Sequence, residues 1–101
     1  MNIIRFWAHS YCRSTFAFYK ALAKELNCEL FIYTFIDNLK IREKVGFDNR
    51  EFKDLNITHI GNNEELAFKL LCEDSQAYNI FCAYQNVKLY QKLIYKLILC
   101  I

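Results

Sequence analysis

The sequence predicts an α/β fold built on a parallel sheet, and two observations carry this prediction. Short apolar runs alternate with amphipathic stretches of helical period along the chain. The first two runs, Ile3 to Trp7 and Leu30 to Ile36, are joined by one such stretch and a short return loop, which is typical of parallel strand–helix–strand pairing. The chain has 101 residues, of which 54% are hydrophobic, so it is long enough for one domain with a modest core.

The first half of the chain is expected to hold two strands. Asn2 to Trp7 is short, continuous and rich in β-branched and aromatic residues, which predicts a strand buried on both faces. Ser14 or Thr15 can cap the helix that follows, and Asn27 is its expected stop. Apolar residues at spacings of three and four define the buried face of this helix. They are Phe18, Tyr19, Leu22, Ala23 and Leu26. We predict a strand from Leu30 to Ile36 next, and then a short helix from Leu39 to Val45 that ends at Gly46.

The second half repeats the alternation. Ile57 to Ile60 predicts a brief strand, and Asn62 with Glu65 forms an Asn-x-x-Glu pattern typical of a capping box at a helix start. This helix is expected to bury Leu66, Leu70 and Leu71, with either Ala67 or Phe68. Asn79 to Ala83 predicts a fourth strand. The last helix is expected from Val87 to about Leu99, with an apolar stripe of Tyr90, Leu93, Ile94, Leu97 and Ile98.

These elements assemble most naturally as a Rossmann-like doubly wound parallel sheet with strand order 3-2-1-4 and helices on both faces. In that order the connections change direction between the first and fourth strands. Ligands bind such sheets at this switch point, outside the carboxyl ends of the strands. Two loops are expected to open there, Ala8–Ser14 and Tyr84–Asn86.

Composition excludes several classes of function. The formal net charge is +2 and Lys and Arg are scattered, so neither nucleic acid nor an anionic membrane is an expected partner. The sequence contains no signal peptide pattern, and no apolar run approaches the roughly 20 residues of a transmembrane segment. The five cysteines are widely spaced without a Cys-x-x-Cys pair, which argues against disulfides and against a metal site. A cytoplasmic protein with reduced thiols is expected.

The two predicted loops offer side chains with chemical potential. His9 can act as a general base near neutral pH, and Arg13 can bind an anionic group through paired hydrogen bonds. Ser10 adds a hydroxyl, Tyr84 can stack on a ligand, and Gln85 can hydrogen-bond to it. The first loop has no glycine and is therefore not a Gly-x-Gly-x-x-Gly phosphate cradle, which argues against NAD, FAD or ATP at this place.

A structural interpretation of the same loops stays open. Ser10 or Ser14 then caps the helix, Arg13 is solvated, His9 packs beside Trp7, and Tyr84 closes the end of the sheet. His59, which precedes Gly61 by two residues at the end of the third strand, is assigned a structural role for the same reason.

A redox interpretation starts from Phe6-Trp7-Ala8 followed by Cys12, which resembles thioredoxin-like proteins with a reactive Cys at a helix N-terminus. The chain departs from that pattern in three ways. Thr15 stands where the second cysteine is expected, Cys12 comes one position late, and the chain has no proline to form the cis-proline loop.

A second resemblance covers the whole chain. The segments Asn2–Trp7, Tyr19–Ala23, His59–Gly61 and Asn79–Gln85 resemble the N-terminal, acceptor-side domain of bacterial GT-B glycosyltransferases of the glycosyltransferase 4 type. Such enzymes often build capsular or cell-surface polysaccharide. In the last segment the family's His, Ser, Gly and Arg are Asn79, Cys82, Ala83 and Gln85 in this chain.

The resemblance implies a truncated or remnant acceptor half over residues 1–101 that is inactive alone. It implies acceptor contacts from His9, Ser10, Arg13, Tyr84 and Gln85, and a sugar or lipid-linked acceptor as partner. The nucleotide-sugar donor would need a second Rossmann-like domain, so no cofactor is expected in this chain. A lipid-linked acceptor would place the protein at the inner membrane. The alternative is a small interaction module that associates with another chain or a second copy through Leu93–Ile101.

Overall fold

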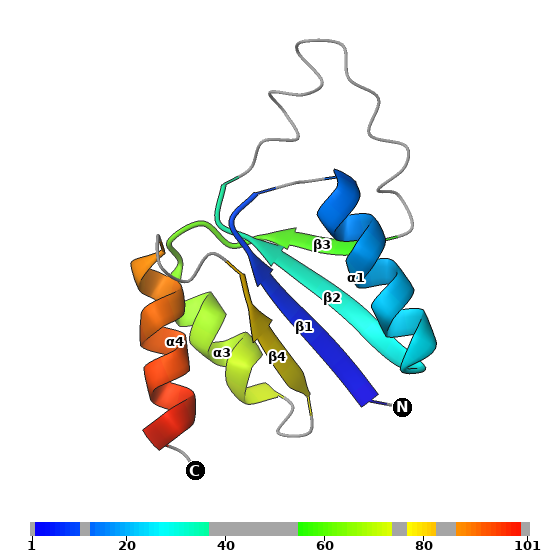
Figure 1. Ribbon diagram of the computed structural model, residues 1–101. Helices are drawn as coiled ribbons and strands as arrows, with labels where there is room; N and C mark the ends of the chain where they lie inside the picture. Colours follow the sequence, from blue (N-terminus) through cyan, green and yellow to red (C-terminus); the bar gives the residue numbers. More distant parts are fainter. Residues whose placement is uncertain (1, 11–12, 37–54, 74–76, 83–86, 100–101) are drawn as a thin grey trace, which may run out of the picture.

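The computed structural model describes residues 2–10, 13–36, 55–73, 77–82 and 87–99 (Figure 1). The predicted helix Leu39–Val45 lies outside these residues. Within them the chain forms four strands and three helices in βαβ–βαβα order. The elements are β1 (Asn2–Ala8), α1 (Arg13–Glu25), β2 (Cys28–Thr34), β3 (Asn56–His59), α3 (Glu64–Glu73), β4 (Tyr78–Phe81) and α4 (Lys88–Leu99).

The four strands form one parallel sheet in the order β3-β2-β1-β4, which confirms the predicted topology. β1 is central: Phe6 pairs with Ile32 of β2 on one side and with Ile80 of β4 on the other. A strand with neighbours on both edges and helices on both faces has no solvent-facing side. Accordingly, every residue of β1 from Ile4 to Ala8 is buried, as the continuous apolar run predicts.

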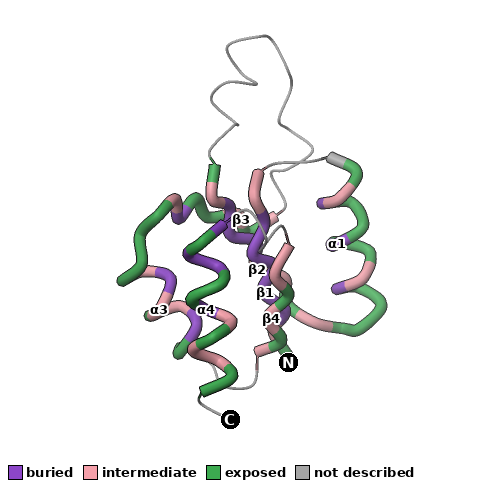
Figure 2. Tube along the Cα trace, turned by 60° about the vertical axis from the view of Figure 1, so that its left-hand side comes forward, coloured by how far each residue is buried: buried purple, intermediate pink, exposed green. Residues whose placement is uncertain are grey.

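Helices cover both faces of the sheet, as Figure 2 shows with α1 on one side and α3 and α4 on the other. Alternate residues of each strand therefore point into two separate apolar clusters. The cluster under α1 comprises Ile4, Phe6, Ala8, Phe16, Tyr19 and Ile32. The cluster under α3 and α4 comprises Trp7, Tyr33, Ile60, Ala67, Leu71, Val87, Leu89, Tyr90 and Leu93.

Trp7 lies at the centre of the cluster under α3 and α4 and is fully buried. Its ring centroid is 4.5 Å from that of Tyr33 and 5.5 Å from that of Phe81. Tyr90 of α4 meets it edge-on at 6.0 Å. The indole Nε1 donates a hydrogen bond to Asn79 Oδ1 at 3.0 Å, so the polar atom of the ring is also satisfied.

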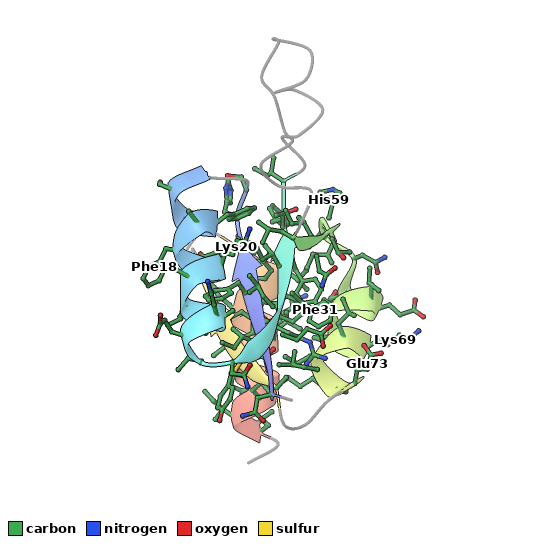
Figure 3. All side chains as sticks on the ribbon, turned by 90° about the vertical axis from the view of Figure 1, so that its right-hand side faces the viewer. Phe18, Lys20, Phe31, His59, Lys69 and Glu73 are labelled. Carbon is green, nitrogen blue, oxygen red and sulfur yellow. The ribbon has the colours of Figure 1, made fainter. Side chains whose placement is uncertain are left out.

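The buried face predicted for α1 is partly wrong. Phe18 and Leu26 are exposed, by 62% and 56%, whereas Phe16 is buried together with Tyr19 and Ala23. Figure 3 shows Phe18 pointing away from the sheet. Apolar residues occur on most sides of this helix, so spacing alone fits more than one stripe. Leu26 lies just past the last helical residue, Glu25, in the turn that leads into β2.

Asn27 ends α1 as predicted, in a left-handed conformation with φ of 53°. This tight reversal brings the chain back at once, so β2 begins at Cys28, two residues earlier than the sequence pattern indicates. Smaller offsets occur elsewhere. β3 and β4 each begin one residue early, and α4 begins at Lys88 rather than Val87.

The capping box predicted for α3 is wrong by one residue. Gly61, with φ of 55°, and Asn62 form a turn that the N–H of Asn63 closes by donating to the Ile60 carbonyl at 3.1 Å. Asn63 is therefore the N-cap, and its Oδ1 accepts the N–H of Leu66 at 3.0 Å. Because the third helical position is Leu66, no glutamate can return a bond to the cap.

This cap supports a direct test. Asn63→Ala is expected to lower the free energy of unfolding by about 1 kcal/mol, because the helix loses the acceptor for an otherwise unpaired N–H. Asn62→Ala is the matched control, since Asn62 lies in the turn before the helix. Urea denaturation of the two variants measures the difference. If the two variants lose equal stability, or if Asn62→Ala loses more, the N-cap is Asn62, as the sequence pattern predicts.

The apolar stripe predicted for α4 is right at its start and wrong at its end. Tyr90 and Leu93 are buried, and Leu89 joins them. Ile98 is 61% exposed, whereas the neighbouring Leu97 is partly buried against the core cluster.

Candidate functional site

The carboxyl-terminal ends of β1 and β4 lie side by side, at the end of the sheet that we call the carboxyl edge. The two strands run parallel as neighbours, and pairing continues past the end of β4, where the N–H of Cys82 donates to the Trp7 carbonyl at 2.8 Å. The predicted switch point between these strands is therefore present. In a doubly wound sheet this edge is where ligands bind.

The exit of β2 is tied to the same place. The His9 carbonyl accepts the N–H groups of Phe35 and Ile36 at 3.2 and 2.8 Å, and the Ala8 carbonyl accepts that of Phe35 at 3.1 Å. Backbone hydrogen bonds thus hold the start of the loop after β1 against the residues that follow β2. A ligand bound here would therefore contact backbone segments that are hydrogen-bonded to one another rather than loops that move independently.

Tyr90 of α4 holds the end of β1 in place. Its hydroxyl donates a hydrogen bond of 2.6 Å to the Ala8 carbonyl, within a fully buried environment. Burial raises the pKa of the Tyr90 hydroxyl far above its ordinary value, with a smaller contribution from nearby Cys82. The group therefore remains a protonated donor, and α4 is fastened to the last residue of β1.

Of the residues predicted for the site, His9 and Ser10 are described most fully. Both are half-buried just beyond the end of β1. The His9 ring lies 6.2 Å from the ring of Phe35, centroid to centroid. Arg13 is the first residue of α1, and its side chain lies outside the described part of the chain. Tyr84 and Gln85 lie wholly outside it.

The redox prediction rests on Cys12, which also lies outside the described residues. Cys82 follows β4 directly, and its Sγ is 2.7 Å from the hydroxyl oxygen of Tyr19. Among the residues that the structure describes, Cys28, Cys72 and Cys82 are free thiols. The redox interpretation stays a prediction.

The described ranges contain no cluster of three or more His, Cys, Asp or Glu side chains suited to a metal ion. His59 ends β3 and is exposed; its Nε2 lies 3.5 Å from where a Cβ on Gly61 would stand. In the same residues, no helix combines the length and the apolar character required to cross a bilayer.

Sequence reasoning missed Arg5. It was included in an apolar strand, yet its guanidinium lies in the interior, 3% exposed, beside Tyr33. The signal was present, because Arg5 is the one charged residue in a run whose other members are apolar from Ile3 to Ala8. Buried charges are rare without a dedicated partner.

Comparison of the chain with known protein families, with curated proteins and with solved structures found no match in any of the three. The class of the protein is therefore defined by its own architecture. It is a Rossmann-like α/β domain with an open switch point between β1 and β4.

Proposed function

We propose that this chain is the acceptor-binding half of a GT-B-type glycosyltransferase, and that it binds a sugar or lipid-linked acceptor without transferring sugar by itself. One observation supports the proposal most strongly: the carboxyl ends of the parallel neighbours β1 and β4 lie side by side. This is the place where the resembling family contacts its acceptor. The segments that resemble that family lie in β1, in α1, at the end of β3 and the turn after it, and in β4 and the residues that follow it in the sequence.

The residues at this edge suit a polyhydroxylated ligand. The imidazole of His9 and the hydroxyl of Ser10 are half-buried, so both can exchange hydrogen bonds with sugar hydroxyls while losing little hydration. Arg13 is the first residue of α1 and, on this proposal, binds the phosphate of a lipid-linked acceptor. Tyr84 and Gln85 follow β4 and complete the proposed acceptor site.

Transfer would need a second domain. Glycosyl transfer requires the donor's leaving diphosphate and the acceptor hydroxyl to be held in register, and an acceptor half supplies only one of these. On this proposal the nucleotide-sugar binds elsewhere, and the protein acts in the cytoplasm or at the inner membrane, where lipid-linked acceptors are found.

The proposal is tested by titrating the labelled protein with soluble acceptor-like oligosaccharides and, separately, with UDP-glucose, while backbone amide NMR signals are followed. Oligosaccharides are expected to shift the signals of His9 and Ser10, and UDP-glucose is expected to shift neither. His9→Ala is expected to weaken saccharide binding about tenfold. His59→Ala, at the exposed end of β3, is the matched control and should bind as the wild type does.

Two outcomes would overturn the proposal. The first is saturable binding of UDP-glucose to the chain alone, which would make it a donor domain. The second is a complete lack of response to every oligosaccharide at millimolar concentration.

A second candidate function is self-association, which the exposed end of α4 favours. Tyr95, Ile98 and Leu99 are apolar and more than 60% exposed. The predicted surface was Leu93–Ile101, but Leu93 is fully buried in the core, and Cys100 and Ile101 lie outside the described residues. On this proposal two copies pair through the exposed residues of α4. Sedimentation velocity should show a dimer that Ile98→Lys disrupts; a monomer at all concentrations would contradict it.

A further inference from the structure

A pocket of about 460 Å³ lies between α3 and the sheet, away from the loops discussed above. Its wall includes Arg5 in the middle of β1 and Glu73 at the last turn of α3. The wall continues across the sheet to Tyr33 of β2 and Thr58 of β3, and neither His9 nor Ser10 belongs to it. The remaining wall is largely apolar, with Phe31 and Leu70, and the hydroxyl groups of Tyr33 and Thr58 add polar atoms.

Arg5 is the unusual member of this wall. Two of its nitrogen atoms, Nε and Nη1, are shielded from solvent and have no hydrogen-bond partner among the described residues. An arginine side chain stays charged in proteins, so it cannot relieve its burial by losing a proton. Leaving buried donors of a charged group unpaired is strongly destabilising. A folded domain seldom retains such a cost without a compensating use.

The surroundings of Arg5 have negative potential but supply no direct acceptor for these two nitrogen atoms. Glu73 lines the same pocket, and the carboxyl-terminal end of the α3 dipole points toward it. Tyr33 lies beside the guanidinium. Burial raises the pKa of the Tyr33 hydroxyl, and a side-chain hydrogen bond with Arg5 and the charge of Arg5 act in the opposite direction without reversing the shift. Tyr33 is therefore protonated and can donate as well as accept.

We propose that this pocket is a binding site for a small molecule that carries one carboxylate on an apolar body, with Arg5 as the anchor of the carboxylate. Because the unpaired N–H groups of Arg5 are shielded from solvent, the side chain rotates on binding so that they donate to the carboxylate oxygens. The hydroxyl of Tyr33 adds a hydrogen bond. The apolar body packs against Phe31 and Leu70. Figure 3 shows Phe31 on the side of the sheet that faces α3, with Glu73 near the end of that helix.

Size and charge restrict the ligand. A volume of about 460 Å³ is within the range of sites for small organic molecules, which are mostly apolar with a few placed polar groups. Glu73 offsets the charge of Arg5, so a singly charged carboxylate leaves the pocket with one negative charge in excess. A phosphate dianion would leave two and would be repelled more strongly by Glu73. The proposal is thus specific for carboxylates and does not depend on sugar binding.

The test compares phenylacetate with phenylacetamide, which has the same shape without the charge, and with inorganic phosphate. Binding is followed by calorimetry and by the rise in melting temperature that a ligand of the folded state produces. Phenylacetate is expected to bind at least about tenfold more tightly than phenylacetamide. Phosphate is expected not to bind.

Variants separate a binding role of Arg5 from a structural one. Arg5→Met keeps most of the volume and removes the unpaired donors, so it should abolish preference for the acid over the amide while the unliganded protein is at least as stable as the wild type. Leu70→Trp keeps Arg5 but fills the pocket and should also abolish binding. Glu73→Gln removes the repulsion and should tighten binding of phenylacetate several-fold.

Each contrary result overturns the proposal. Equal affinity for phenylacetate and phenylacetamide would remove the role of charge, and tighter binding of phosphate would assign the pocket to another class of anion. Unchanged phenylacetate binding in Leu70→Trp would place the ligand elsewhere. No binding of phenylacetate at millimolar concentration, combined with a destabilised Arg5→Met, would make Arg5 a structural residue.

Discussion

Trp7→Ala is expected to lower the free energy of unfolding by about 3–5 kcal/mol, which is the usual cost of truncating a buried aromatic side chain. Trp7 is fully buried, its ring meets those of Tyr33, Phe81 and Tyr90, and its Nε1 satisfies Asn79. Removal of the ring leaves a cavity where three elements meet and an amide without its partner. Domains of this size have only about 5–15 kcal/mol of stability in total.

Urea denaturation followed by far-ultraviolet circular dichroism measures this loss. Phe18→Ala is the matched control, because Phe18 is an aromatic residue of the same chain whose ring is largely exposed. It should change stability by less than about 0.5 kcal/mol. If the two variants lose similar amounts, the cluster around Trp7 is not the main core of the fold.

The effect of Tyr90→Phe on the free energy of unfolding is expected to change sign as the pH rises. Near neutral pH the variant should be less stable by about 1 kcal/mol, because it lacks the buried hydrogen bond to the Ala8 carbonyl. That carbonyl still accepts the N–H of Phe35, so the loss remains moderate. Above about pH 10 the comparison changes, since unfolded Tyr ionises there and folded Tyr90, with its raised pKa, does not.

The sign follows from proton binding. Above the unfolded pKa the folded state holds one more proton than the unfolded state, so wild-type stability falls by about 1.4 kcal/mol for each pH unit. Tyr90→Phe lacks this dependence. The stability curves of the two proteins should therefore cross roughly one unit above pH 10. Tyr95→Phe, on the exposed side of α4, is the control. Parallel curves at alkaline pH would show that Tyr90 is not held protonated by the fold.

Much of the architecture could be predicted because it depends on local pattern and on general rules of chain connection. The apolar run from Ile3 to Trp7 predicts a strand buried on both faces, and β1 is the central strand with both faces covered. Strand–helix–strand units with short returns pair in parallel, and from this rule the order 3-2-1-4 followed. Asn27 was recognised as a stop because asparagine tolerates the left-handed conformation that it adopts.

The errors arise where the sequence offers two equivalent choices. Phe16 and Phe18 are identical residues two positions apart, and only packing against the sheet decides that Phe16 is buried. Asn62 and Asn63 present the same choice at the start of α3. There the turn through Gly61 decides it, because that turn occupies Asn62 and leaves the cap to Asn63.

The candidate sites were predictable only in part. The position of the switch point depends only on strand order, so it can be predicted from the sequence, and it locates the loops after β1 and β4. It says nothing about Tyr90, which is 82 positions from Ala8 in the sequence yet donates to its carbonyl. Nor does it reveal the pocket at Arg5, whose wall comes from three strands and one helix.

The position of Trp7 gives the protein an internal optical reporter. It is the single tryptophan of the chain, and it is shielded from water between Tyr33 and Phe81, with Tyr90 edge-on. Its fluorescence in the native state should peak at short wavelength and gain intensity by energy transfer from the two tyrosines. If α4 left the sheet, the indole would lose Tyr90 but keep Tyr33 of β2 and Phe81 of β4, so its emission should shift to longer wavelength and lose part of the energy transfer. One emission spectrum therefore reports the docking of the last helix without any added label.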